Sequence, residues 1–329
     1  MKITRKYLVV ICILMILLLG GCAEKPQEKI FRVGIMSGAE AFIHIADGFK
    51  ERMNELGYIE GKNIFFDLQD SGLEEAQQVA KKFVEDNVDL IFAFPTEPSV
   101  AAKAAAKDTN IPVVFSLAGI EGTDLVESLQ HPGDHITGVR FPAPESTVKR
   151  LEFLHEIVPD AKRVWIIHDP NYPLAGPSLA MLRPASTSLG ITLVETPIAG
   201  IEDIRQILSD KARSGKIDVD AIFIMPEVLT QTPECFGAIM EFANKYKIPI
   251  GGAMDYTTDL GAVFNQAPDV IEMGRLAAVL ADKIFKGTPA GSIPVVTPEL
   301  YLRLNYKKAQ ELGLVMPEGL MAQAREIIR

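Results

Sequence analysis

Short apolar segments alternate with amphipathic helical patterns along most of this chain of 329 residues. Segment 88–94 is a nearly continuous apolar run, which is typical of a parallel strand buried on both faces. Between residues 42 and 56, apolar side chains recur at the spacing of one helix face. Strands that alternate with helices favour parallel sheets covered by helices on both sides.

The alternation occurs twice along the chain. The first set contains strands 31–36, 64–68, 88–94 and 111–115 and helices 42–56, 73–86 and 97–107. The second set contains helices 145–157, 174–189, 201–213 and 233–246 and strands 163–168, 191–195, 221–225 and 248–251. The pairs Leu-Gly, Val-Asp and Ile-Pro recur in the same order at offsets of 131 to 137 residues. We therefore predict an α/β fold of two doubly wound parallel-sheet lobes joined by a hinge.

The last part of the chain is expected to serve both lobes. Strand 262–265 and helix 269–286 have the character of elements that cross back to the first lobe, and segment 293–305 with two short helices returns to the second. These patterns predict a first lobe of residues 31–139 plus about 266–290, and a second lobe of residues 140–265 plus about 291–329. Pro184 lies inside helix 174–189 and predicts a kink or break there.

The N-terminus has the pattern of a secretory signal: a cationic start, an apolar run at 7–19 and then Gly20-Gly21. The stretch from Leu19 to Cys22 resembles the lipobox of bacterial lipoproteins, which implies cleavage after residue 21 and lipid attached to Cys22. An uncleaved membrane anchor is the alternative, but the run is shorter than the roughly 18–20 residues that span a bilayer. Residues 22–30 then form a polar tether. We expect a location outside the cytoplasm, anchored to the cell membrane.

Composition and missing motifs narrow the function. Removing residues 1–21 takes three positive charges from a chain of net charge −10, which leaves −13 and argues against nucleic acid as a partner. The cysteines at 12, 22 and 235 leave no pair for a disulfide in the mature chain. The five histidines lack the helical spacing of metal ligands, and no phosphate-binding glycine loop or Gly-x-Ser-x-Gly motif occurs. We therefore expect a binding protein, not an enzyme, with no metal and no cofactor.

The loops after the strands are the candidate ligand site, because ligands bind at the carboxyl ends of parallel strands. Helix N-termini near these loops suit a carboxylate, and acidic side chains opposite them suit an ammonium group, so an amino acid would match both. The candidate ligand-binding residues are Ser37, Thr96, Ser116, Asp169, Asn171, Glu227 and Asp255. The candidate apolar lining is Phe94, Phe141, Tyr172 and Met254. The alternative for Thr96, Asp169 and Asn171 is a role as helix caps alone.

Several motifs of the chain from residue 31 to the end resemble the ABC-transporter substrate-binding proteins of the tryptophan/tyrosine-binding type. They are Leu56-Gly-Tyr-Ile-Glu-Gly-Lys-Asn63, Val88-Asp-Leu-Ile91, Ile111-Pro-Val-Val-Phe115, Leu129-Gln-His-Pro-Gly133, Ile136-Thr-Gly-Val139, Leu302-Arg-Leu-Asn-Tyr306 and Leu312-Gly-Leu-Val-Met-Pro317. The resemblance implies a type I periplasmic-binding fold that captures an amino acid, often aromatic, and delivers it to a permease. It also implies that residues 138–140 form the first of three hinge crossings.

Two stretches depart from this family pattern. Met225-Pro-Glu227 stands where the family usually has a Thr-Asp or Thr-Asn pair, and residues 265–274 replace a stretch usually rich in tyrosine. The floor of the cleft is therefore altered. We expect a monomeric, lipid-anchored receptor that closes by hinge motion on a small solute and docks on an ABC permease. A sensor subunit of a signalling system and an enzyme on the same scaffold are the alternatives.

Overall fold

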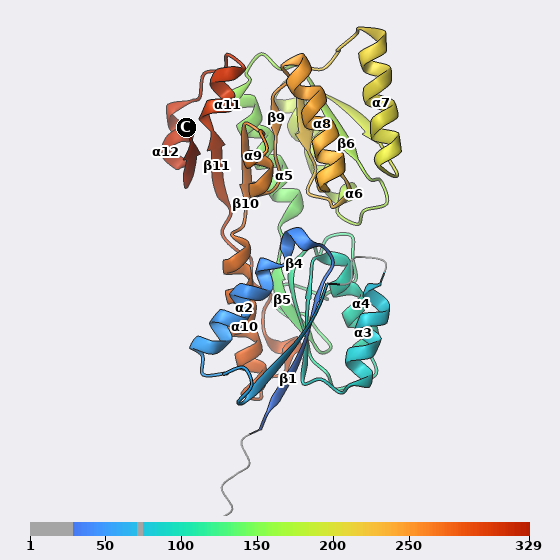
Figure 1. Cartoon of the computed structure of the whole chain (residues 1–329), viewed down its shortest axis with the longest axis vertical. Coiled ribbons are helices and arrows are strands. Elements are labelled where there is room, and N and C mark those ends of the chain that lie inside the picture. The colour runs from blue at the N-terminus through green and yellow to red at the C-terminus, as the bar shows by residue number, and fades with distance from the viewer. Residues whose placement is uncertain (1–28, 71–74) are drawn as a thin grey trace, which may run out of the picture.

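The computed structural model describes residues 29–70 and 75–329. Figure 1 shows two α/β lobes stacked along the long axis of the molecule. The sheet of the first lobe is parallel throughout, in the order β2-β1-β3-β4-β5. Its strands are β1 (Phe31–Ser37), β2 (Ile64–Asp70), β3 (Leu90–Phe94), β4 (Val113–Ala118) and β5 (Ile136–Arg140).

Helices cover both faces of this first sheet. One face packs against α2 and α10, and the other against α3 and α4. The helices are α2 (His44–Glu55), α3 (Ala76–Glu85), α4 (Thr96–Ala106) and α10 (Val270–Phe285), with a 3₁₀ turn η1 (Glu40–Phe42) before α2. The pair α2 and α10 approach closely at Gly48 and Gly274, where an added Cβ would lie 2.0 Å from a backbone oxygen of the other helix. Glycine at both positions therefore lets α10, from late in the chain, pack closely against α2 of the first lobe.

The second lobe has a seven-stranded sheet in the order β12-β11-β10-β9-β8-β6-β7, in which only the β10–β11 pair is antiparallel. Its strands are β6 (Arg163–His168), β7 (Thr192–Pro197), β8 (Ala221–Ile224), β9 (Ile250–Gly251), β10 (Phe264–Ala267), β11 (Tyr301–Asn305) and β12 (Glu326–Ile328). Its helices are α5 (Ala143–Ile157), α6 (Ala175–Ser188), α7 (Ile201–Ser214), α8 (Pro233–Tyr246), α9 (Asp255–Asp259), α11 (Tyr306–Glu311) and α12 (Glu318–Gln323). Two 3₁₀ turns complete the described elements: η2 (Leu229–Gln231) in the second lobe and η3 (Ala290–Ser292), which contacts β5 of the first lobe. Separate hydrophobic clusters fill the two faces of the sheet.

The expected α/β fold with two parallel-sheet lobes is confirmed, but the crossings lie elsewhere than predicted. The strand expected at 262–265 is β10, which pairs with β9 and β11 inside the second sheet up to Ala267. Residues 291–296 stay with the first lobe, since Thr137 Oγ1 donates to Ile293 O at 2.7 Å and Val296 pairs with Val139. The first lobe therefore takes up the chain after Ala267 and keeps it through Val296, and the boundaries expected near 266 and 291 are wrong by a few residues.

Two local expectations also change. Residues 138–140, expected as the first hinge crossing, are the end of β5, and the chain crosses only after this strand. Helix α6 is not broken at Pro184, because Leu179 and Leu182 before the proline are buried in the core of the second lobe, and Ala185 after it packs against the same core. Among the described residues, no helix is long and apolar enough to cross a membrane.

Candidate ligand-binding cleft

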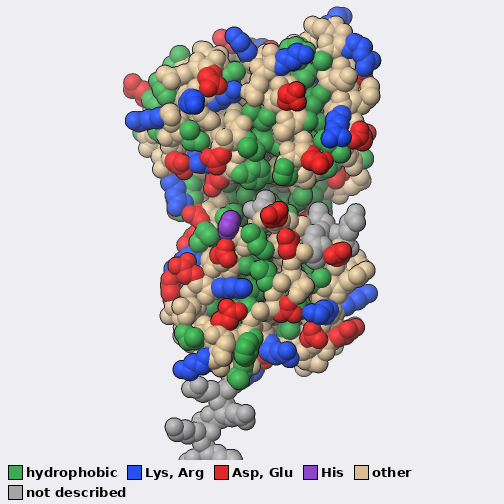
Figure 2. Space-filling view, viewed as in Figure 1, with side chains coloured by type: hydrophobic (Ala, Val, Ile, Leu, Met, Phe, Trp, Pro, Cys, Tyr) green, Lys and Arg blue, Asp and Glu red, His purple; other side chains and the backbone are tan. Residues whose placement is uncertain are grey.

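The two lobes face each other with the carboxyl ends of their strands. A cavity of about 20 Å³ lies between them, and its wall includes Pro95 after β3, Leu117 in β4, Tyr172 after β6, Pro226 after β8 and Met254 after β9. This is the arrangement that the doubly wound topology predicts for each lobe. Figure 2 shows hydrophobic side chains at the waist where the lobes meet.

A larger hollow of about 560 Å³ adjoins the cavity and shares Phe42, Val228 and Gln231 with its wall. It lies between the beginning of α2 in the first lobe and the η2 turn with Tyr256 in the second. The cavity by itself holds about one water molecule. In this arrangement of the lobes the cavity is therefore too small for a solute of amino-acid size, and the hollow is the larger space beside it.

Apolar contacts close the lobes on each other. Phe42 and Leu117 of the first lobe belong to the same hydrophobic cluster as Phe141, Leu174 and Met254 of the second. Three of the four candidate lining residues, Phe141, Tyr172 and Met254, lie in the wall of the cavity. The fourth, Phe94, is buried in the first lobe and belongs to the same hydrophobic cluster.

Two glycines after β4 allow a close approach between the lobes. A Cβ on Gly119 would lie 2.0 Å from Leu174 Cδ2, and one on Gly122 would lie 2.4 Å from the backbone oxygen of Pro173. Leu174 and Pro173 belong to the loop after β6 in the second lobe. The loop after β4 therefore needs small residues for this closed arrangement.

The polar candidates of the first lobe are buried and mostly engaged. Ser37 Oγ donates to Ala39 O at 3.0 Å, and Thr96 Oγ1 accepts from Gly119 N at 3.1 Å. Ser116 is fully buried within β4, and its Oγ has no partner in the part of the chain that the structure describes. Thr96 and Ser37 thus stabilise the loops at the mouth of their own sheet.

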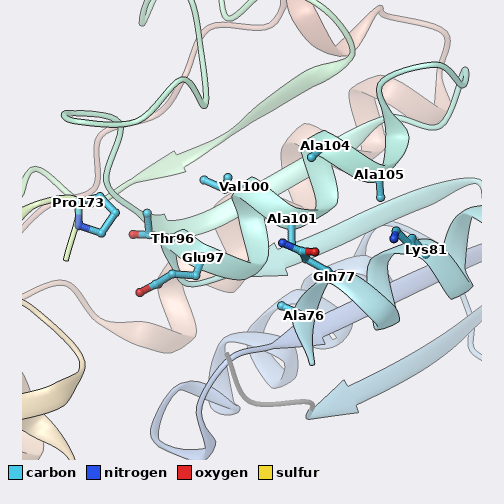
Figure 3. Close-up of a pocket in the computed structure, with 10 residues that line it drawn as sticks. All are labelled: Ala76, Gln77, Lys81, Thr96, Glu97, Val100, Ala101, Ala104, Ala105 and Pro173. Atoms are coloured by element: carbon cyan, nitrogen blue, oxygen red, sulfur yellow. The ribbon is translucent and has the colours of Figure 1, made fainter. Parts of the chain in front are cut away.

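Thr96 also lines a groove of about 440 Å³ between α3 and α4, beside Pro173 of the second lobe. Figure 3 shows Thr96 and Glu97 at the beginning of α4 on the side where Pro173 lies, with alanines of α4 facing Ala76 and Gln77 of α3. Burial raises the pKa of Glu97, and the charge of Asp169 across the lobes adds to this. Glu97 was not among the sequence candidates, and its position directly after Thr96 was the available signal.

Asp169 and Asn171 form a turn after β6. Asp169 Oδ1 accepts from Asn171 N at 2.8 Å, as in a side-chain-capped turn. Asn171 is exposed, whereas the Asp169 carboxylate is close enough to Glu97 and Glu227 to raise the pKa of both. Asp169 therefore contributes negative charge to the cleft, in addition to its role in the turn.

Glu227 is the acidic side chain that lines the cavity directly. It is only 2% exposed and accepts from two backbone N–H groups, Thr230 at 3.0 Å and Leu229 at 3.2 Å. Burial raises its pKa to about 7, although these hydrogen bonds favour the charged form. The carboxyl thus titrates near neutrality inside the cleft.

Gln231 holds the backbone beneath Glu227. Its Nε2 donates to Glu227 O at 2.7 Å, and Tyr256 Oη donates to Gln231 O at 2.6 Å. Burial and the charge of Glu227 raise the pKa of the Tyr256 hydroxyl. Gln231 was missed from the sequence because its position depends on the η2 turn, which no apolar periodicity predicts.

Asp255 begins α9 and is exposed. Its backbone oxygen accepts from Arg303 Nη1 at 3.1 Å. The residues on either side of it, Met254 and Tyr256, supply the wall of the cavity and of the adjoining hollow.

Arg140 ties the first crossing to both lobes. Its guanidinium lies 2.6 Å from Glu121 in the loop after β4 and 2.8 Å from Glu145 in α5, and its Nε donates to Thr297 Oγ1 at 3.0 Å. Thr297 directly follows the last residue that pairs with β5. One buried side chain therefore connects the first and third crossings.

Two α/β lobes with parallel-sheet edges facing a shared cleft define the type I periplasmic-binding-protein class. The chain belongs to the family of ABC transporter substrate-binding proteins, whose model matches residues 33–328. It is 29% identical over 252 residues to a tyrosine-binding protein from Clostridioides difficile strain R20291, covering 76% of this chain and 70% of the relative.

Solved structures have the same fold over nearly the whole chain. A conserved domain protein from Vibrio cholerae matches with a TM-score of 0.81 and 26% identity, covering 91% of this chain and 100% of that one. The ABC domain from Streptococcus pneumonia in complex with L-Trp matches with a TM-score of 0.80 and 20% identity, with the same coverage. The family assignment and fold predicted from the sequence are thereby confirmed.

Proposed function

We propose that this chain is the lipid-anchored receptor of an ABC importer and captures an amino acid with an apolar or aromatic side chain in the interlobe cleft. The observation that carries the proposal is a cavity walled by apolar side chains of both lobes, with a buried acidic group, Glu227, at its edge. The names of two relatives, a tyrosine-binding protein and a complex with L-Trp, support the amino-acid class.

The apolar wall suits the side chain of such a ligand. Phe42 and Leu117 would contact it from the first lobe, and Phe141 and Met254 from the second. Complete burial of a large apolar side chain contributes about 1.5–3 kcal/mol. Because the contacts come from both lobes, a ligand binds the closed form better than the open form and shifts the equilibrium toward closure.

Among the polar candidates, Glu227 would contact the ligand. Asp169 would add negative charge to the cleft, and Thr96 would stabilise the loop at its mouth. Closure would then present both lobes in a fixed orientation to a permease. The tether at Cys22, which lies outside the described residues, would keep the receptor at the membrane surface. Binding and lobe movement, not bond chemistry, would be the activity.

The test is a thermal-shift screen of the mature protein against the twenty amino acids, after native mass spectrometry has shown that no small molecule was carried through purification. A ligand at a hundred times its Kd adds about 2.7 kcal/mol to the free energy of unfolding and raises Tm. We expect aromatic or other apolar amino acids to raise Tm the most. If none of the twenty does so while a sugar or nucleoside does, the proposed ligand class is wrong.

A further inference from the structure

Glu227 and Gln231 form a buried pair of hydrogen-bond acceptors in the wall of the cleft. Both line the cavity between the lobes, and they are 2% and 7% exposed. Gln231 Nε2 is engaged with Glu227 O, so the side-chain oxygen Oε1 is turned the other way. This oxygen is buried and has no partner among the residues that the structure describes. A buried acceptor of this kind is stabilised by a donor that reaches it.

The charge around this pair is negative. Asp169 lies near enough to raise the pKa of Glu227, and it does the same to Glu97 in the opposite lobe. No Lys, Arg or His belongs to the described wall of the cavity. In the adjoining hollow, His44 is exposed and contacts Asp47 at 2.8 Å. A cationic donor therefore fits the cleft better than an anion.

One of the helix N-termini expected to suit a ligand carboxylate, that of α4, is already engaged. At the start of α4, the Glu97 carboxylate accepts from its own backbone N–H, and Pro98 has no N–H to offer. Thr96 Oγ1 accepts from Gly119 N, which leaves this hydroxyl turned to the neighbouring loop. A second carboxylate brought to this position would meet Glu97.

We propose that the cleft recognises its ligand through a protonated amine, held by Glu227 and by Oε1 of Gln231, and that a carboxylate on the ligand is dispensable. The proposal rests on the function proposed above and specifies its substrate class: apolar or aromatic primary amines, of which amino acids are the members that carry an additional carboxylate. That carboxylate would point into the hollow of about 560 Å³, where the site is open to solvent. Glu227 is then the residue that determines specificity, at a position where the chain departs from its family pattern.

A series of three compounds with one side chain tests this directly: tyrosine, tyramine and 3-(4-hydroxyphenyl)propionate, with the matching indole series beside it. Isothermal titration calorimetry of the full mature protein gives the affinity for each. Removing the amine leaves Glu227 buried without its partner, which weakens binding by roughly 30-fold or more. We expect tyramine or tryptamine to bind within about tenfold of the amino acid.

Two variants and one control assign the effect to the pair. Glu227→Gln should reduce the preference for the amine over the deaminated acid by at least about tenfold. Gln231→Met removes the second acceptor and keeps a side chain of similar size. It should also reduce the preference for the amine over the deaminated acid, so the test remains valid if one of the two variants folds poorly. Glu234→Gln changes an exposed carboxylate at the start of α8 and should leave the preference unchanged.

The outcomes separate this inference from the proposed function. It is overturned if the deaminated acids bind as well as the amino acids, if the amines do not bind, or if both variants that fold keep the wild-type preference. In each of these cases, binding of the amino acid itself would leave the proposed function standing. If no member of either series binds, the proposed aromatic ligand class is wrong, and so is the proposal that the cleft recognises a protonated amine.

Discussion

Replacing Gly119 with alanine should weaken ligand binding without destabilising either lobe. Its new Cβ would lie 2.0 Å from Leu174 Cδ2, and Leu174 is only 2% exposed and cannot swing freely away. Forcing an extra methyl group into packed surroundings costs about 1–3 kcal/mol. Because Gly119 belongs to the first lobe and Leu174 to the second, this penalty falls on the closed form alone.

The expected loss of affinity is therefore about 5- to 150-fold, the range that corresponds to 1–3 kcal/mol. Calorimetry with the amino acid found in the thermal-shift screen measures it, and urea unfolding of the ligand-free variant should stay within about 0.5 kcal/mol of the wild type. Leu174→Ala in the Gly119→Ala background should restore part of the affinity. Gly176→Ala is the matched control, because no atom lies within 4 Å of its added Cβ. Unchanged affinity of Gly119→Ala, or no recovery in the double variant, would refute closure through this contact.

Three further predictions concern charge, hinge and anchor. Burial raises the pKa of Glu227 from 4.5 to about 7, so the folded ligand-free protein binds more protons than the unfolded chain between these values. Its free energy of unfolding should therefore fall as the pH rises from 4.5 to 7, by at most about 3 kcal/mol. An identical fall in the Glu227→Gln variant would show that Glu227 is not its cause. Arg140→Ala removes the ion pairs to Glu121 in the first lobe, at 2.6 Å, and to Glu145 in the second, at 2.8 Å. Ligand dissociation in stopped-flow measurements should therefore be faster by roughly fivefold or more. An unchanged dissociation rate would exclude a role of Arg140 in the hinge. Cys22→Ala should move the protein from the membrane fraction to the soluble fraction of cells and abolish labelling by radioactive palmitate, with ligand affinity unaffected; retention in the membrane would contradict lipid anchoring.

Much of the fold follows from patterns that the sequence shows openly. The apolar run at 163–168 and the helical pattern at 233–246 coincide with β6 and α8 as observed. Both are long, strongly periodic segments whose burial is decided locally. The landmarks that repeat between the two halves correctly indicated two lobes of similar design.

The crossings were less predictable, because they depend on contacts between distant segments. Residues 291–296 have no strand or helix periodicity, and they join the first lobe through Thr137 and Val139. Strand β12, at 326–328, was not expected either, since it is defined by its pairing with β11. Tertiary packing, not local preference, determines these elements.

In the candidate site, too, some residues could be predicted from the sequence pattern and others depend on tertiary packing. The rule that ligands bind at the carboxyl ends of parallel strands pointed to the loop that contains Glu227, and this residue lines the cavity between the lobes. It did not find Gln231, whose position depends on the η2 turn, or Glu97, which comes near Asp169 only when the lobes are together. Asp255 was expected to face the ligand, yet its neighbours Met254 and Tyr256 provide the wall. The beginning of α9 determines the directions of these consecutive side chains, and the spacing of residues in the sequence does not predict them.

The most direct test of ligand capture by closure is the distance between the lobes with and without ligand. Spin labels at Lys107 in the first lobe and Met181 in the second, both exposed, can be placed in a Cys22→Ala background, where Cys235 is buried. Double electron–electron resonance then reports the distribution of distances between the two labels. The account predicts a broad distribution without ligand that shortens and narrows when the amino acid is added. Saturating binding with no change in that distribution would contradict it.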